Sequence, residues 1–206
     1  MADEIVERAR SQRGLITRAQ ARELGLTDRM IAGRIADGSW ERLRSGVYVV
    51  GAAPKGWGQR VQAACLAAGP DAVASHRTAA RIWGLVDRSG RIELTVPRPR
   101  RVRLPGVTVH QSSFLEPHDG AVVGSLAVTS LPRTITDLAG RHPLRTVERW
   151  IDQGIRDLDL DLSELAACCT RLTRPGMPAP RTAMPSPASL TAVPRPMPLL
   201  APVTIT

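Results

Sequence analysis

The chain has 206 residues, of which 43% are hydrophobic but only 3% aromatic, so one domain or two small ones with an aliphatic core can form. Its 28 basic and 19 acidic residues give a formal net charge of +9, which favours anionic partners, nucleic acid first and an anionic membrane second. The charged N-terminus excludes a signal peptide, and no apolar run reaches the ~18 residues of a membrane helix. The three cysteines have no metal-ligand spacing. We therefore expect a cytoplasmic protein without a membrane segment.

The first 50 residues predict a helix-turn-helix. Three helices are expected, over residues 3–12, 18–24 and 28–37. The first carries three apolar residues on one side, Ile5, Val6 and Ala9. Thr17 and Gln20 form a capping-box pattern before the second helix, and Thr27 is the N-cap of the third. Gly25 and Gly38 end these two helices, so the turn "GLT" between them has helix-turn-helix length.

The third helix has the faces of a recognition helix. At 100° per residue Ile31 and Ile35 point inward. The opposite face carries one arginine and small residues, namely Arg29, Ala32 at its border, Gly33 and Ala36. Because N-terminal residues of a recognition helix reach base edges, Arg29 is the candidate for reading a base in the major groove. Arg34 lies nearer the inward side and is expected to contact a phosphate or an intramolecular partner, and Thr27 can add a phosphate contact.

A basic hairpin follows the third helix. The stretch "WERLRSGVYVV" predicts two strands around "SG", with Arg42 and Arg44 near the tip. This is the position of the wing in a winged helix, where basic side chains contact backbone phosphates. Hairpins are common and a helical arginine is usually only solvated. The order of helix, two capped helices and basic hairpin is much less common and favours DNA binding by residues 1–50.

A second domain is expected after a linker of Gly, Ala and Pro over residues 51–59. Its predicted helices span residues 58–68, 76–83, 132–139, 143–156 and 163–172. Its predicted strands are a short buried one before Ser75, residues 91–96 and 107–111, and two around Gly124 within 121–129. Residues 60–173 thus form a mixed α/β domain, and the fold class of the chain is α+β. Residues 174–206 hold nine of the 17 prolines and no acidic residue, and we expect a disordered Pro-rich tail.

Four arginines stand between the two longer predicted strands, Arg98, Arg100, Arg101 and Arg103. Alternate residues of an extended segment face the same way, so Arg101 and Arg103 can act together. The run is either a solvated loop or a basic patch. As a patch it would extend a DNA footprint or meet an acidic partner surface.

Residues with catalytic chemistry occur in spacings that predict no active site. A triad needs groups that converge in space, so Ser75 is expected to cap a helix and His76 to lie in its first turn. The acidic residues near the last helix fit no calcium loop and predict a solvated face: Asp152, Asp157, Asp159, Asp161 and Glu164. The other histidines lack ligand spacing: His110, His118 and His142. We expect no catalytic residue, no metal, no cofactor and no enzyme.

Residues 1–173 resemble the AbiEi-type antitoxins of type IV toxin–antitoxin (abortive infection) systems. The resemblance rests on "GLITRAQARELGLTDRMIAGRIADGSWERLRSGVYVV", "ASHRTAARIWGL" and "LPRTITDLA". It implies a winged-helix domain that binds the promoter of its own operon as a transcriptional autoregulator. It also implies a C-terminal domain that counters a nucleotidyltransferase-like toxin.

Relatives of this architecture often continue into a DUF559 endonuclease-like domain with a strand-borne acidic motif, which is absent here. One hypothesis is therefore that the Pro-rich end is a frameshift or truncation product and the chain a remnant of such a protein. The other alternative is a protein-binding module that does not bind DNA.

Overall fold

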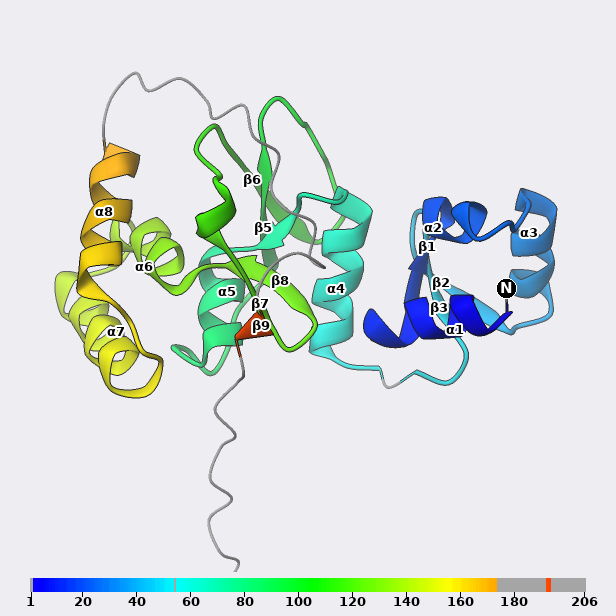
Figure 1. The fold of residues 1–206 in the computed structure, drawn as a ribbon, viewed down its shortest axis with the longest axis horizontal. Helices are drawn as coiled ribbons and strands as arrows, with labels where there is room; N and C mark the ends of the chain where they lie inside the picture. Colours follow the sequence, from blue (N-terminus) through cyan, green and yellow to red (C-terminus); the bar gives the residue numbers. More distant parts are fainter. Residues whose placement is uncertain (1, 54, 174–191, 194–206) are drawn as a thin grey trace, which may run out of the picture.

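The computed structural model describes residues 2–53, 55–173 and 192–193, which form two lobes with helix α4 between them (Figure 1). The N-terminal lobe contains, in chain order, α1 (Ala2–Ser11), β1 (Leu15–Thr17), α2 (Arg18–Glu23), α3 (Asp28–Ala36), β2 (Trp40–Arg44) and β3 (Val47–Val50). This is the predicted order of three helices and a hairpin, with one additional strand, β1. The mixed α+β class is confirmed.

The helix caps of the N-terminal lobe form as predicted. The Gln20 amide donates to the Thr17 hydroxyl at 3.1 Å and the Thr17 amide donates to the Gln20 side chain at 3.0 Å, which completes a capping box. The Thr27 hydroxyl accepts from the Met30 amide at 3.3 Å. Gly25, with φ +87°, follows α2 in the left-handed region that favours glycine. These caps fix the turn that sets α3 against α2.

A three-stranded antiparallel sheet of order β1-β3-β2 supports the helices of this lobe. Its core buries apolar side chains of the helices and the sheet: Ile5, Ile16, Ala21, Leu26, Ile31, Trp40 and Tyr48. Ile31 is 3% exposed and Ile35 packs against the cluster, so the predicted inward face of α3 is confirmed. Val6 is instead 38% exposed, because the lobe is too small to cover the whole apolar side of α1.

The second lobe is built on a mixed six-stranded sheet of order β6-β5-β4-β8-β7-β9. Its strands are β4 (Val73–Ala74), β5 (Ile92–Pro97), β6 (Val107–Ser112), β7 (Gly120–Val123), β8 (Leu126–Thr129) and β9 (Ala192–Val193). Its helices are α4 (Trp57–Ala68), α5 (His76–Trp83), the short 3₁₀ helix η1 (Pro117–Asp119), α6 (Leu131–Ala139), α7 (Leu144–Asp157) and α8 (Leu162–Thr173). Strands β5 and β6 run parallel, whereas β4 runs antiparallel to β5.

Helix α4 packs on both lobes. Ala63 is fully buried in a cluster with Leu15, Val47 and Val49 of the N-terminal sheet. The opposite side of α4 contributes Val61, Ala64 and other residues to the core of the second lobe. The Gln59 side chain also donates to the carbonyl of Arg13 at 3.0 Å. The predicted linker 51–59 therefore ends inside a helix that connects the lobes through packing.

The predicted disordered tail falls largely on residues 174–191 and 194–206, which lie outside the described residues. Ala192 and Val193 are described, and they pair in parallel with β7 at the edge of the sheet. Among the described helices, none has both the length and the apolar character needed to cross a membrane.

Candidate nucleic-acid interface

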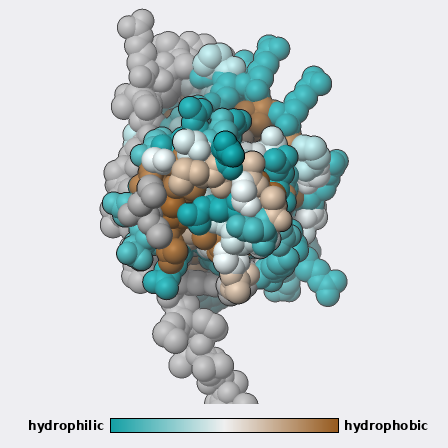
Figure 2. All heavy atoms as spheres, turned by 90° about the vertical axis from the view of Figure 1, so that its right-hand side faces the viewer, coloured by the Kyte–Doolittle hydropathy of each residue, from teal (hydrophilic) through white to brown (hydrophobic). Residues whose placement is uncertain are grey.

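Helix α3 exposes the face that the sequence assigned to the major groove. Arg29, Ala32, Gly33 and Ala36 are all exposed. A Cβ added at Gly33 would meet no atom within 4 Å, so this side of α3 is open. Figure 2 views the molecule from the N-terminal end and shows a mainly hydrophilic surface with smaller apolar patches. An outward face with one arginine and small residues leaves room for close approach of a groove wall.

The start of α3 carries an ion pair that joins it to α2. Arg18 donates to both carboxylate oxygens of Asp28, at 2.9 and 2.5 Å, and this hydrogen-bonded pair lowers the pKa of Asp28. The negative charge beside Arg29 is therefore offset by a guanidinium that also connects α2 to α3. The amide end of the helix dipole adds positive potential at the same place.

Arg34 has the intramolecular partner that the sequence left as one of two options. Its guanidinium lies over the Trp40 ring, 5.6 Å from the ring centroid. This contact packs the last turn of α3 against the start of β2. Arg34 is half-buried, so its part in holding the helix is visible in the structure, whereas a phosphate contact stays a prediction.

The two arginines of the hairpin differ in their surroundings. Arg42 is exposed on β2. Arg44 is half-buried, and its Nη1 donates to the carbonyl of Pro105 at 3.2 Å. Burial lowers the pKa of Arg44. The hydrogen bond places the hairpin beside the loop between β5 and β6, so Arg44 positions that loop in addition to any contact with a ligand.

The arginine run of the β5–β6 loop also divides into outward and inward members. Arg98, Arg101 and Arg103 are exposed. Arg100 points inward, where it lies 3.7 Å from the Asp71 carboxylate and donates to the Ala68 carbonyl at 3.4 Å. A hollow of about 220 Å³ is lined by Arg98, Pro99, Arg101 and Gln111. Three of the four arginines are thus exposed and Arg100 has partners within the protein, while the role of the run as a basic patch stays a prediction.

The motif "LPRTITDLA" forms α6 and carries a buried ion network. Arg133, with a side chain only 5% exposed, donates to Asp137 at 2.9 Å and to Asp119 at 3.2 Å. Arg171 of α8 also pairs with Asp119. Burial raises the pKa of Asp137. Because Arg133 of α6 and Arg171 of α8 both pair with Asp119 of η1, the network holds η1, α6 and α8 together.

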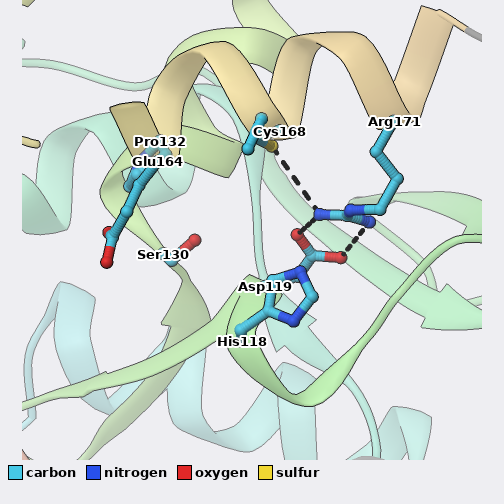
Figure 3. Close-up of a pocket in the computed structure, with 8 residues that line it drawn as sticks. His118, Asp119, Ser130, Pro132, Glu164, Cys168 and Arg171 are labelled. Carbon is cyan, nitrogen blue, oxygen red and sulfur yellow. Dashed lines mark hydrogen bonds and ion pairs between the residues drawn. The ribbon is translucent and has the colours of Figure 1, made fainter. Parts of the chain in front are cut away.

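A hollow of about 240 Å³ lies beside this network (Figure 3). Its walls come from the end of β8, η1, α6 and α8: His118, Asp119, Ser130, Pro132, Glu164, Ala167, Cys168 and Arg171. Figure 3 shows the Asp119 carboxylate facing Arg171, and the two groups form an ion pair at the wall of this hollow. Burial raises the pKa of Cys168, which leaves its thiol a weak nucleophile at neutral pH.

Three side chains that the sequence did not connect meet elsewhere in this lobe. The His76 and His110 rings stack with centroids 3.8 Å apart, and His110 Nε2 lies 2.8 Å from the Glu93 carboxylate. Burial lowers the pKa of His76 to about 4, and His110 adds to the shift. Ser75 is the N-cap residue of α5 as predicted, but its hydroxyl is 3.0 Å from His76 Nδ1 and makes no side-chain cap. The cap prediction is therefore wrong in its hydrogen bond.

Two further sequence predictions are confirmed at α8. The Asp161 carboxylate accepts from the Ser163 amide at 2.6 Å and so begins this helix. The acidic residues around it are exposed, as expected of a solvated face: Asp152, Asp157, Asp159, Asp161 and Glu164.

Comparisons with known proteins agree with this architecture. Residues 3–51 match the family model described as transcriptional regulator, AbiEi antitoxin, which confirms the predicted resemblance over the N-terminal lobe. No curated protein matches the chain. The crystal structure of the RV2827C protein from Mycobacterium tuberculosis is similar with a TM-score of 0.54 and 16% sequence identity, over 84% of this chain and 71% of that chain. At this identity the likeness shows a common fold for the two lobes and nothing further.

Proposed function

Since residues 3–51 are of the AbiEi antitoxin type, a family of transcriptional regulators, we propose that this protein binds the operator DNA of its own operon. The observation that carries the proposal is the exposed face of α3, where Arg29 stands among small residues on a capped helix. In a winged helix this face enters the major groove, and the guanidinium fork of Arg29 matches the O6 and N7 acceptors of guanine.

Backbone contacts come from the hairpin and its neighbouring loop. Arg42 is exposed on β2, and Arg101 and Arg103 are exposed on the loop that Arg44 fastens to the hairpin. Guanidinium groups in these places neutralise phosphates on one side of the groove that α3 occupies. Thr27 and the amide end of α3 supply a further phosphate contact. The DNA-binding surface then spans residues 1–50 together with the loop of the domain at 60–173.

The experiment that tests base reading is the Arg29→Ala variant. We expect its affinity for the upstream DNA of its own gene to fall by about 1–3 kcal/mol, with a smaller loss on a shuffled duplex. Arg149→Ala is the matched control, since Arg149 is exposed on α7 in the other lobe and loses the same charge. Equal losses on both duplexes would exclude a base contact.

The second lobe is proposed to counter a toxin, which the resemblance identifies as a nucleotidyltransferase-like protein. Three apolar side chains of α7 and α8 are exposed and serve as candidate contacts for this partner: Leu144, Ile155 and Leu162, at 71%, 46% and 54%. Co-expression with the product of the neighbouring gene tests this function. A Leu144→Asp and Leu162→Asp double variant should lose rescue of growth while still binding DNA. Full rescue of growth by this variant would exclude Leu144 and Leu162 as contacts of the toxin.

A further inference from the structure

Three potential metal ligands converge in the second lobe, and each comes from a different element. His76 begins α5, Glu93 lies on β5 and His110 on β6. Their ligand atoms all lie within 4.8 Å of one another. His76 is buried, and the His110 and Glu93 side chains are 19% and 15% exposed, so the cluster lies just below the surface with access from solvent.

The sheet brings these residues together. In the parallel pair of β5 and β6, His110 stands opposite Thr95, one diagonal step from Glu93 on the same face. Strand β4 pairs with the other edge of β5, and the Ser75 amide just after β4 donates to the Glu93 carbonyl at 3.0 Å. This pairing places His76, the next residue, beside Glu93. His76 follows with φ +51°, a left-handed conformation that is uncommon for a residue other than glycine. In this conformation the His76 ring stacks on the His110 ring.

We propose that His76, Glu93 and His110 bind a divalent transition metal of the Zn²⁺ class, with a further coordination position left for water. Two imidazoles and one carboxylate are a ligand set that Zn²⁺ takes in sites with three protein ligands. Calcium and magnesium prefer oxygen ligands, so the two imidazoles select against them.

The surroundings supply the outer contacts of such a site. The Ser75 hydroxyl engages Nδ1 of His76, which leaves Nε2 of this ring for the metal. The rings are stacked with their planes 19° apart, so metal binding requires a rotation about χ2, a torsion with broad energy wells in histidine. Arg133 and Arg141 add positive potential at His76, and the charge of Glu93 opposes it. Asp137 interacts electrostatically with the other ring, that of His110.

A metal in this place would connect the start of α5 to two strands and so stabilise the second lobe. The proposal is independent of DNA binding, since its ligands lie outside the N-terminal lobe. It therefore stands or fails separately from the proposed function.

The test uses the untagged full-length chain, stripped with a chelator and titrated with Zn²⁺ against a chromophoric competitor. We expect one Zn²⁺ per chain, and a loss of affinity of about 100-fold or more in Glu93→Gln and in His110→Ala, above the 10–100-fold cost of changing an outer contact. The control is His118→Ala, because His118 is an exposed histidine outside the cluster and its replacement should leave binding unchanged.

Circular dichroism establishes whether each variant is folded. In a second measurement Co²⁺ is added to the unaltered chain in place of Zn²⁺, and its visible absorption is recorded. Visible absorption bands of Co²⁺ with nitrogen ligation support the site even where a variant fails to fold. A wild-type chain that binds less than one Zn²⁺ would overturn the proposal. So would folded Glu93→Gln and His110→Ala variants that bind as tightly as the wild type.

Discussion

The β5–β6 loop makes a testable contribution to the salt dependence of DNA binding. Arg101 and Arg103 are exposed, and the hydrogen bond from Arg44 to Pro105 sets their loop beside the hairpin. If both guanidiniums neutralise phosphates, the double variant Arg101→Ala and Arg103→Ala binds all duplexes more weakly. The loss should not depend on sequence, because phosphate contacts do not read bases.

The magnitude follows from the release of counterions. Each phosphate contact contributes about 0.9 to the slope of log affinity against log salt, so the double variant should lose about 1.8 from the slope. Between 50 and 200 mM salt, the affinity advantage of the unaltered protein should then shrink by about twelvefold. Fluorescence anisotropy titrations at several salt concentrations measure both slopes on one labelled duplex.

A charge-matched control separates contact from general attraction. Arg145 and Arg149 are exposed on α7, which lies in the second lobe away from the N-terminal lobe (Figure 1). Replacing both with alanine removes the same charge and should leave the slope within about 0.3 of the wild type, since distant charges are screened beyond about 10 Å at 0.1 M salt. Equal slopes for the loop variant and the wild type would refute the reasoning, as would equal losses in loop and control variants.

Three further predictions concern the fold that holds these surfaces. Arg133→Met should destabilise the protein by about 3–5 kcal/mol in urea unfolding, because it leaves its buried carboxylate partners short of a cation; a loss below 1 kcal/mol would contradict this. Thr17→Ala should cost about 1 kcal/mol through the lost capping box, measured in the same way, and an unchanged midpoint would count against it. Burial raises the pKa of Cys65 to about 12. Iodoacetamide at pH 8 should therefore modify half-buried Cys169 and leave Cys65 unmodified until urea unfolds the protein. Labelling of Cys65 before urea is added would disprove its burial.

Much of the N-terminal lobe could be predicted because its signals are local. Thr17, Gln20 and Thr27 satisfy amides only a few residues away, so their caps follow from spacing alone. Strand β1 could not be predicted because its three residues, Leu15–Thr17, include the helix cap and are too few to show alternation. It forms only because β3 offers a partner, with Leu15 opposite Val49.

Arrangements that depend on distant pairing could not be predicted. Nothing in the run of arginines distinguishes Arg100, which turns toward Asp71, from its exposed neighbours. The convergence of His76, Glu93 and His110 depends on the register of β5 against β6 and on the pairing of β4 beside them. Sequence spacing does not encode this register, so no ligand motif in the sequence marks the cluster.

The central claim is that α3 and the hairpin recognise specific DNA. The most direct measurement is an anisotropy titration of the full-length protein onto the DNA upstream of its own gene and onto a shuffled duplex of the same composition, at several salt concentrations. If α3 reads bases, the protein binds the upstream DNA more tightly than the shuffled duplex by at least about tenfold, or about 1.4 kcal/mol. Equal affinity for the two duplexes, or no binding at about 50 mM salt where phosphate contacts are strong, would contradict it.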